Sequence, residues 1–567
     1  MATTVLPAAM APPRRRLARD EWVARGAIVI FALWLTVTVA LPIWALLSKS
    51  FQNPRGEFVG LANYATYFSN PALFASFWNS IMVAAIASAV VLPGAFAYAY
   101  ALTRTRMRGK GLFSTLSLIP ILAPSLLPAI ALIYLFGNQG MLRELLYGRS
   151  IYGPLGIVLA EAFYTFPHAL LILVTALNTA DARLYESAAA LGASPRRVFF
   201  TVTLPGARYG ILSAALVVFT LVMTDFGAPK VIGGRFNVLA TDVYKQVIGQ
   251  QNFSMGAVVG MMLLFPAVLS FGAERFVRRR QMAQLTAQAV PLVPKPQPLT
   301  DWTFLALSTL IITPIVAMLA TAGWASFIRF WPYNLAVSLH NYNFRQFETS
   351  GWLPYVNSLK LAGLTATLGT ALIFTGAYLQ EKTRGLSLFR SLFQLFAMLP
   401  LAVPGLVLGI GYIFFFNARS NPLNVLYGTM AILVINTIAH FYTVGHLTAT
   451  TALKQLDSEF EAVSASLRAP WYRTFLKVTV PVSLPAILDI AVYMFVNAMT
   501  TVSAVIFLYL PATRLASIAV VYIEETGQQG AAAAMAMMIV YTSAMVKVLH
   551  ILVSRTLDRR TQAWRRR

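Results

Sequence analysis

Few side chains in this sequence could do chemistry, and those that could stand far apart along the chain. Glu161 and His168 are seven residues apart, which is two helical turns and places both on one face of a helix. Inside an apolar stretch such a pair could relay protons or form a satisfied structural pair, and we favour the structural pair. The 5 histidines include His440 and His446, but no two of them stand at a metal-ligand spacing beside a carboxylate. Since the chain also has 0 cysteines, the sequence predicts no metal site, thiol catalysis or disulfide.

A second set of polar side chains occurs at the ends of two apolar stretches. The set comprises Thr224, Asp225, Asn497, Thr500, Thr501 and Ser503. Polar groups are costly in hydrocarbon, so we expect this set to face the interior of a helix bundle and to line a translocation path. Hydrogen bonding between helices is the alternative role. Asp225 could meet the ammonium group of a substrate, or it could contact Lys230.

Apolar stretches of membrane-spanning length make up most of the chain that positions these residues. Of the 567 residues, 58% are hydrophobic and 11% are charged, against about 45–50% and about 25% in soluble proteins. About 20 consecutive apolar residues are long enough to cross a bilayer. The predicted spans are 27–47, 77–102, 112–136, 152–177, 209–229, 254–274, 303–326, 356–379, 392–416, 427–450, 485–509 and 530–553. The sequence therefore predicts an all-α integral membrane protein with twelve transmembrane helices.

The formal charge of +24 could suggest a nucleic-acid partner, but the positions of the basic residues argue against one. Most of the 44 Lys and Arg residues fall before the first span, in every second loop and at the end of the chain, as at 14–16, 104–110, 275–280 and 559–567. Basic loops are retained in the cytoplasm, so both termini are predicted to be cytoplasmic. The charge reports membrane topology, and no nucleic-acid partner is expected.

The two halves of the sequence repeat each other. Residues 177–205 read LNTADARLYESAAALGASPRRVFFTVTLP, and 276 positions later residues 453–481 read LKQLDSEFEAVSASLRAPWYRTFLKVTVP. Outside this segment, Asn79-Ser80 matches Asn357-Ser358 at a slightly different offset. Six spans in each half with the same orientation predict two parallel six-helix halves related by an axis along the membrane normal. In this register Thr437 occupies the position of Glu161, so a symmetric proton relay is excluded.

The predicted domain organisation follows from the spans and the repeat. It comprises a cytoplasmic basic segment at 1–26, a first six-helix half at 27–274, a cytoplasmic linker rich in Pro and Arg at 275–302, a second half at 303–553 and a cytoplasmic basic tail at 554–567.

The repeated segment also predicts a loop of defined shape. Residues 185–191 favour a helix, and Gly192 can adopt the left-handed conformation that ends it. Ser194 and Pro195 suit the N-cap and the first position of a second short helix. Pro205 stands where the fifth span must begin. We therefore expect a short helix, a sharp break and a second short helix near the cytoplasmic membrane surface.

The first copy of this loop, with ESAAALG at 186–192 followed by Leu204-Pro205, resembles the EAA loop of binding-protein-dependent ABC importer permeases. In that family the loop forms a coupling helix that docks in a groove of a separate ATPase subunit. The resemblance implies a docking role for Glu186, Ala189, Gly192 and Pro205. A plain connector between helices is the alternative.

The second copy, with Glu461, Leu467, Arg468 and Pro481, departs from the family pattern. Glu461 stands one position early, and Arg468 replaces the glycine. An arginine cannot take the left-handed conformation without strain, so we expect the second loop to dock differently.

The chain has no nucleotide-binding machinery of its own. It contains no G-x-x-x-x-G-K-[ST] phosphate loop, and no nucleophile–base pair or paired carboxylates that would indicate an enzyme. The resemblance implies that ATP is used by a separate chain, in two copies of an ABC ATPase, while this chain binds no cofactor. It also implies a periplasmic substrate-binding protein as a partner, and a place in the lipid of a bacterial inner membrane.

The resemblance covers nearly the whole chain and extends to fused permeases with two six-span halves. The stretches 223–230, 241–246 and 497–504 are most similar to putative 2-aminoethylphosphonate permeases. This implies import of 2-aminoethylphosphonate from periplasm to cytoplasm. Ferric iron import is the alternative within the class. A secondary transporter is the alternative from another class, but it would leave the repeated cytoplasmic loop unexplained.

Overall fold

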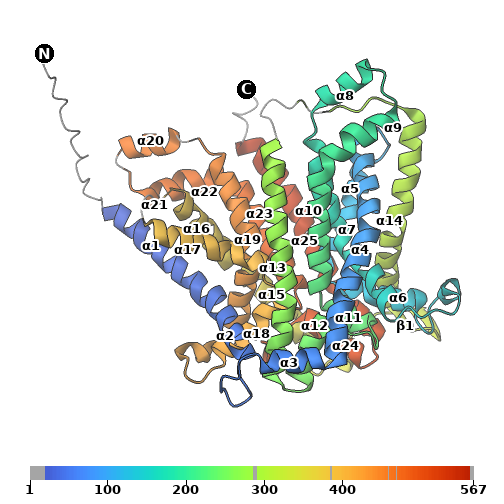
Figure 1. The fold of residues 1–567 in the computed structure, drawn as a ribbon, viewed down its shortest axis with the longest axis vertical. Helices are drawn as coiled ribbons and strands as arrows, with labels where there is room; N and C mark the ends of the chain where they lie inside the picture. The colour runs from blue at the N-terminus through green and yellow to red at the C-terminus, as the bar shows by residue number, and fades with distance from the viewer. Residues whose placement is uncertain are drawn as a thin grey trace, which may run out of the picture.

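The computed structural model describes residues 19–284, 290, 292–382, 386–457, 459–467 and 469–561. Within these ranges the chain is almost entirely helical, with one small antiparallel sheet of β1 (Ile328–Phe330) and β2 (Asn334–Val337) (Figure 1). Nine of the described helices are long and apolar enough to cross a membrane, and three bent helix pairs raise the number to as many as twelve. The prediction of an all-α membrane protein is confirmed. Arg468, the start of the basic N-terminal segment and the last part of the basic tail lie outside the described residues.

The helices of the first half, in chain order, are α1 (Arg19–Leu35), α2 (Leu41–Ser50), α3 (Ala62–Ser69), α4 (Pro71–Arg104), α5 (Lys110–Leu118), α6 (Leu126–Phe136), α7 (Pro154–Asn178), α8 (Ala182–Ala190), α9 (Pro195–Val198), α10 (Leu204–Thr224), α11 (Gly227–Ile232), α12 (Leu239–Tyr244) and α13 (Phe253–Gln284). Those of the second half are α14 (Pro298–Phe327), α15 (Leu353–Leu364), α16 (Thr370–Lys382), α17 (Ser387–Met398), α18 (Gly405–Phe416), α19 (Met430–Lys454), α20 (Glu459–Ser466), α21 (Trp471–Thr474), α22 (Val480–Val482), α23 (Leu484–Thr500), α24 (Ala516–Glu525) and α25 (Gln529–Thr561).

The structure repeats in the register that the sequence predicts. Helix α7 begins at residue 154 and α19 at 430, a difference of 276, and α10 and α23 end at residues 224 and 500 with the same difference. Two π-helical turns, Phe199–Thr203 and Phe475–Thr479, also correspond. The two halves therefore repeat one unit, including this pair of irregular turns.

Two of the predicted spans are broken rather than straight. The predicted span 112–136 consists of two helical segments that meet at 103° just before Leu126, and 392–416 consists of two that meet at 120° just before Gly405. Pro124 and Pro404 stand at these breaks. Proline has no N–H to donate and disfavours helical geometry in the residue before it, so each span turns sharply there.

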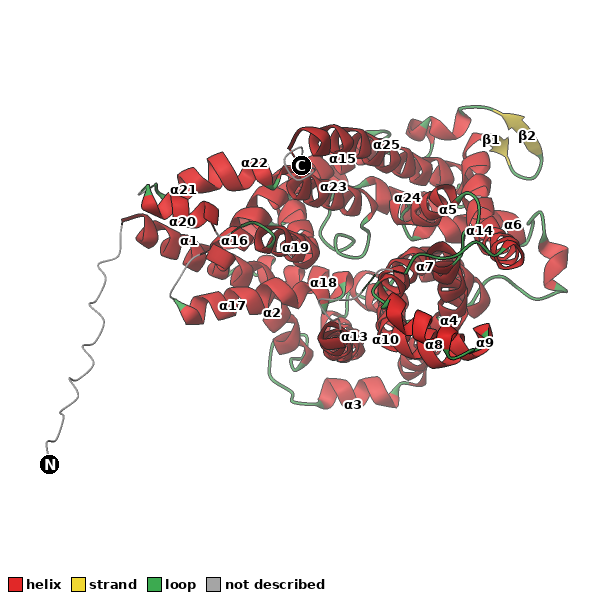
Figure 2. Cartoon of the chain, turned by 90° about the horizontal axis from the view of Figure 1, so that it is seen from above, coloured by secondary structure: helices red, strands yellow, loops and turns green. Residues whose placement is uncertain are grey.

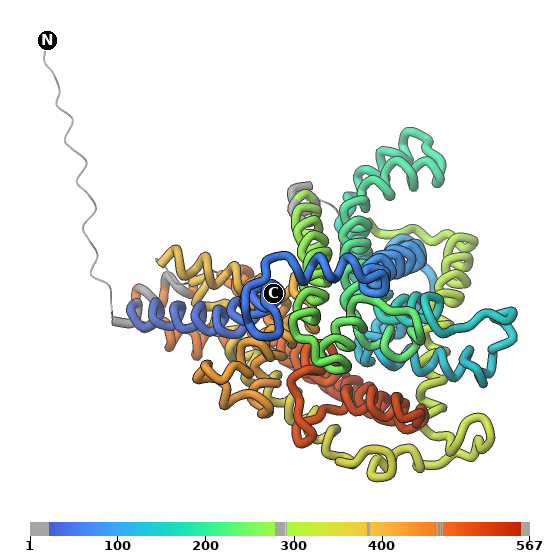
Figure 3. Tube along the Cα trace, turned by 60° about the horizontal axis from the view of Figure 1, so that its bottom comes forward, coloured from blue at the N-terminus to red at the C-terminus, as the bar shows by residue number. Residues whose placement is uncertain are grey.

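The first span of each half packs against the other half, which the sequence did not predict. Helix α1 packs against α16 and α17, and α2 against α18, while α14 packs against α4 and α6 (Figure 2). The Tyr412 hydroxyl of α18 donates to the Thr38 carbonyl at 2.7 Å, and Tyr100 stacks on Phe304 with ring centroids 5.1 Å apart. Figure 3 shows the same exchange, with the blue N-terminal helix lying along orange segments of the second half. The first span of each half therefore packs against helices of the other half and holds the two halves together.

The repeated Asn-Ser pairs have one structural role. Ser80 Oγ accepts a hydrogen bond from the Leu239 N–H at 2.8 Å, and Ser358 Oγ accepts one from the Ala516 N–H at 2.8 Å. The asparagine before each serine donates to a backbone carbonyl just before the residue bonded to that serine: Asn79 to the Asn237 carbonyl, and Asn357 to the Ala512 carbonyl. In both halves, therefore, the second span holds the segment that follows the fifth span.

Candidate docking loops and translocation path

The first repeated loop has the cap geometry that its sequence predicts. The Asp181 side chain caps α8 by accepting from the Arg183 N–H at 3.0 Å. Gly192 has φ +69°, and the Ala193 N–H closes the turn on the Ala188 carbonyl at 3.0 Å. Open space surrounds the position of a side chain at Gly192, so the backbone conformation alone requires glycine there.

The predicted boundary between the second short helix and the fifth span is wrong. After Ser194, whose Oγ accepts from the Arg197 N–H, the helix runs without interruption from Pro195 to Thr224. The π-helical turn that directly precedes α10 accommodates Pro205, which has no N–H to donate to the turn before it. In the second half the corresponding helix bends by 78° between Val482 and Leu484.

An arginine that sequence reasoning did not connect to the loop supports it from the second span. Arg104, at the end of α4, donates to the Leu177 carbonyl at 2.6 Å, and its guanidinium lies 5.0 Å from the Tyr185 ring centroid. The Tyr185 hydroxyl donates to Thr203 at 3.1 Å. Arg104 was interpreted only as a topology signal, because nothing in the sequence links positions that are about 80 residues apart. These contacts fix α8 relative to the membrane-spanning helices.

The side chains assigned to docking lie on the surface of the first loop. Glu186, Ala189, Gly192 and Pro205 are all exposed. Leu191, at the tip, is 86% exposed. The surface of the first loop is therefore accessible to another molecule, and its docking role stays a prediction.

The second loop closes the same turn without a glycine. The Ala469 N–H donates to the Ser464 carbonyl at 3.0 Å, which matches the Ala193–Ala188 bond of the first loop. Leu467, the counterpart of Leu191, is 76% exposed. Glu461 lies in α20, and Pro481 in α22 is exposed, while Arg468 lies outside the described residues. Altered docking of this loop therefore stays a prediction.

Both loops project from one face of the molecule. Figure 1 shows α8 and α20 at the top of the view, on the side where α1 begins and α25 ends. We call this side the docking face. The repeat therefore places one such loop from each half on the same face.

The predicted path residues lie where the fifth span of each half ends. Thr224 and Thr500 are the last residues of α10 and α23, and both are partly exposed. Their hydroxyls donate to their own helices, Thr224 to the Thr220 carbonyl at 2.8 Å and Thr500 to the Val496 carbonyl at 3.0 Å. Hydroxyls already bonded to the backbone can line a polar path without an unpaired donor.

The other second-half members of this set have local roles. Asn497 donates to the Tyr493 carbonyl at 2.8 Å, and Thr501 is buried. Ser503 fills the space at Gly405, where a Cβ would lie 2.6 Å from its Oγ. In the first half the arrangement is reversed, since Ser125 Oγ fills the space at Gly227. Participation of these residues in a path stays a prediction.

Glu161 does not form the predicted pair with His168. The His168 ring bonds to the Tyr164 carbonyl at 3.2 Å, while Glu161 faces Asp225, at the end of α10. Asp225 Oδ2 accepts from the Ala228 N–H at 2.9 Å. The seven-residue spacing on one helix face was real, but the carboxyl turns toward a partner on another helix.

The two halves meet at the face opposite the docking face. Lys230 Nζ lies 2.6 Å from Glu525 Oε1 of the second half, so the suggested contact between Lys230 and Asp225 is replaced by this ion pair. Lys230 also lies 4.8 Å from the ring centroid of Tyr244, which itself approaches Phe507 of the second half at 6.3 Å. These contacts join the halves at the outer end of the candidate path.

Glu524 adjoins this junction in α24. Burial, and next the charge of Glu525, raise the pKa of the Glu524 carboxyl to about 7, and Lys230 partly opposes the shift.

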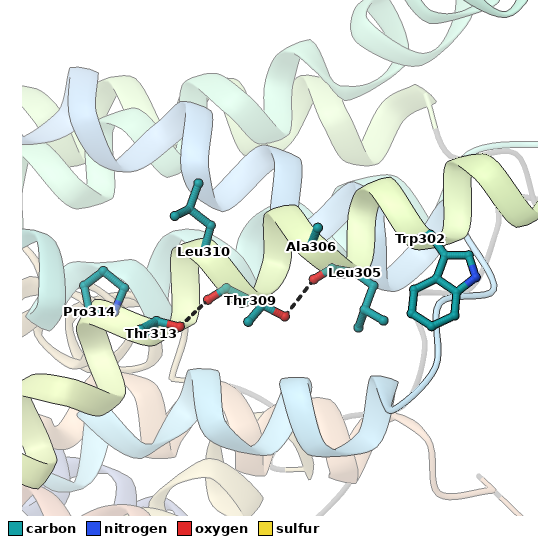
Figure 4. A pocket seen from close by; sticks show the side chains of 7 residues that line it. All are labelled: Trp302, Leu305, Ala306, Thr309, Leu310, Thr313 and Pro314. Atoms are coloured by element: carbon teal, nitrogen blue, oxygen red, sulfur yellow. Dashed lines mark hydrogen bonds between the residues drawn. The ribbon is translucent and has the colours of Figure 1, made fainter.

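A surface groove follows α14, with its lining drawn in Figure 4. Its lining residues are Trp302, Leu305, Ala306, Thr309, Leu310, Thr313 and Pro314. Thr309 and Thr313 donate to carbonyls of their own helix at 2.8 Å and 2.7 Å. With these hydroxyls occupied, the groove offers an apolar wall that suits an acyl chain better than a small polar solute.

Of the remaining histidines, His550 lies with its Nε2 3.2 Å from Asp489 Oδ1. His440 and His446 have buried Nδ1 atoms with no hydrogen-bond partner. Among the residues that the structure describes, no three His, Asp or Glu side chains gather where they could hold a metal ion.

The fold and the loops together define a duplicated, multi-pass membrane protein with two docking loops on one face. The chain belongs to the family described as "Binding-protein-dependent transport system inner membrane component", which matches residues 90–282 and again 372–562. Each match contains one of the two docking loops.

Similar curated proteins include permeases for several solutes. A ferric transport system permease protein of Actinobacillus pleuropneumoniae is 27% identical over 453 residues, which are 77% of this chain and 64% of the relative. A putative ferric transport system permease protein of Haemophilus influenzae is 29% identical over 415 residues, 70% of this chain and 64% of the relative. A thiamine transport system permease protein of Brucella abortus is 24% identical over 391 residues, 67% of this chain and 68% of the relative. The chain thus spans a little under two thirds of the length of the two ferric permeases.

Proposed function

We propose that this chain is the transmembrane permease subunit of an ATP-driven importer, without catalytic activity of its own. The observation that carries the proposal is the pair of capped, exposed loops on one face, each with a leucine at its tip that is at least three-quarters exposed. A connector with no partner would gain nothing from holding an apolar side chain in water twice.

Two copies of a separate ABC ATPase would dock on Leu191 and Leu467 and the helices behind them. When ATP brings the two ATPases together, α8 and α20 would be drawn toward each other. Because α8 is tied to the bundle through Arg104 and Tyr185, this movement would pass to the helices that line the path. Hydrolysis would return the halves to the closed outer junction at Lys230 and Glu525.

The docking face would lie in the cytoplasm of a bacterial cell, with both termini, and the opposite face in the periplasm. The basic residues concentrated in the loops of the docking face support this orientation. A periplasmic substrate-binding protein would deliver the solute to the outer face.

The substrate we propose is 2-aminoethylphosphonate, on the resemblance of the stretches around Asp225 and Asn497. A zwitterion with one ammonium and one phosphonate group suits a path lined by hydroxyls and amides together with the carboxylate of Asp225. The second candidate is ferric iron, supported by the names of two relatives that each match at least 70% of this chain.

Uptake of radiolabelled 2-aminoethylphosphonate tests the proposal, with cells that lack the gene compared with the same cells complemented by it. Restored uptake that excess ferric chelate does not inhibit would support the proposed substrate. Uptake of labelled iron, restored by the gene while the phosphonate is not taken up, would replace the substrate and keep the importer. If neither solute is taken up in cells that contain the ATPase and the binding protein, both candidate substrates are wrong.

A further inference from the structure

The first half contains a carboxyl group whose position the docking and path assignments leave unexplained. Glu161 is fully buried in α7, and neither carboxyl oxygen has a hydrogen-bond donor among the described residues. Leaving a buried polar group without a partner is costly. Its neighbour is the carboxyl of Asp225, so the two acidic groups face each other.

Two carboxyl groups in contact inside a membrane protein cannot both be ionised without a positive partner. One shared proton leaves the pair with one negative charge. Asp225 is also held by the Ala228 N–H at 2.9 Å and the Ser125 hydroxyl. These donors favour the charge on Asp225, which is partly exposed, while Glu161 lies behind it. The negative charge of the pair therefore rests on Asp225.

Aromatic rings from both halves border this charge. Tyr164, one turn along α7 from Glu161, lies close enough to interact electrostatically with Asp225 and with Tyr493 of α23. Tyr164 and Tyr493 are both partly exposed. A carboxylate beside aromatic rings and phenol oxygens is the environment that binds cations, by ion pairing and by the negative faces of the rings. Tyr164 belongs to the first half and Tyr493 to the second, so the group draws on both halves of the chain.

The second half folds in the same way without carboxyl groups at the positions that correspond to Glu161 and Asp225. In the 276-residue register Thr437 replaces Glu161 and Thr501 replaces Asp225, so both acidic groups are exchanged together. Thr437 simply donates to the Leu433 carbonyl of its own helix at 2.7 Å. The same helices pack with threonines in one copy and with carboxyls in the other, so packing alone does not explain the acidic pair.

We propose that Glu161 and Asp225, with Tyr164 and Tyr493 beside them, form a cation-binding site in the translocation path that holds the positively charged group of the solute. The site rests on the proposed importer function and adds to it the chemistry that selects the solute within the membrane. A primary ammonium group and ferric iron share the required positive charge. Asp225 would contact the cation, and Glu161 would keep the shared proton and orient Asp225.

The variant Glu161→Thr combined with Asp225→Thr tests the site, because it copies residues that already stand in the second half. The permease, purified with its ATPase and binding protein and reconstituted in liposomes, is assayed for ATP-driven uptake of 2-aminoethylphosphonate and of ferric citrate. We expect uptake of the solute whose ammonium group or metal ion the site holds to fall about tenfold or more, which corresponds to the loss of a charged hydrogen bond. ATP hydrolysis stimulated by the binding protein should persist. Glu144→Thr, an exposed carboxylate outside the path, is the matched control and should leave uptake unchanged.

A binding measurement on the unmodified complex does not depend on the folding of any variant. Calorimetric titration of the permease–ATPase complex, without the binding protein, with 2-aminoethylphosphonate, ethylphosphonate and ferric citrate identifies the charged group that binds to the site. Binding of 2-aminoethylphosphonate without binding of ethylphosphonate supports an ammonium site, and binding of iron alone supports an iron site. Equal binding of both phosphonates, no binding of any of the three, or unchanged uptake by the double variant would overturn the proposal. Failure of the proposed importer is distinguished by the loss of ATP-driven uptake in the unmodified complex itself.

Discussion

Removing the leucine at the tip of a docking loop should weaken capture of the ATPase without disturbing the permease. Leu191 is 86% exposed and Leu467 is 76% exposed, so neither contributes to packing within this chain. Complete burial of a leucine in a partner's groove is worth about 1.5–3 kcal/mol. Leu191→Ser should therefore lower the affinity for the ATPase by roughly ten- to a hundredfold.

The assay measures the binding of purified ATPase to the permease in nanodiscs by biolayer interferometry. Leu467→Ser is measured in parallel, and a smaller effect would show that the second loop docks less tightly. Leu145→Ser is the matched control, because Leu145 is 61% exposed on the opposite face. If Leu191→Ser binds the ATPase as tightly as the unmodified protein, the tip does not enter a groove and the docking assignment fails.

Three further substitutions, and one control substitution, test the docking turn, a buried ion pair and a partly buried carboxyl. Gly192→Arg places a residue with a side chain at φ +69°, which costs about 1–2 kcal/mol of backbone strain. The variant should abolish transport, while membrane insertion, measured by quantitative blotting, stays normal. Unchanged transport would contradict the coupling role. Glu348→Gln removes the carboxylate that lies 2.6 Å from Arg514 and should lower the free energy of unfolding by about 3–5 kcal/mol, measured as a lower melting temperature. Glu381→Gln, at the more exposed pair with Lys454, should lower it by less than about 1 kcal/mol. Equal effects of the two substitutions would refute the argument from burial. Because burial raises the pKa of Glu524 to about 7 from a usual 4.5, the folded state binds the proton more tightly than the unfolded state. Stability is therefore greatest at low pH and falls as pH rises from about 4.5 to about 7, so Glu524→Gln should flatten the melting temperature measured between pH 5 and pH 8; an unchanged slope would contradict it.

Local sequence signals predicted the features of this protein that depend on neighbouring residues. Gly192 takes the left-handed conformation because a helix cap needs it, and the repeat of 276 residues fixed the correspondence of α7 with α19. The breaks at Pro124 and Pro404 also depend on neighbouring residues. Hydropathy, however, is averaged over a window of residues and therefore predicts a straight span through each of these prolines.

Contacts between distant segments could not be predicted from the same signals. Exchange of α1 and α14 between the halves leaves every span apolar, so hydropathy does not distinguish it from two separate bundles. Glu161 stands on one helix face with His168, yet it interacts with Asp225, whose position depends on the chain turning after α10. The pairing of Lys230 with Glu525 likewise depends on how the halves meet.

In the proposed importer this chain forms the path, and a separate ATPase drives it through the two loops. Solute uptake into liposomes that contain the permease and the solute-loaded binding protein tests it most directly, with ATPase and ATP added or omitted. The account predicts uptake only when both ATPase and ATP are present, and none when Gly192→Arg replaces the unmodified permease. Uptake that proceeds without ATPase, driven by an ion or proton gradient, would contradict the account and identify a secondary transporter.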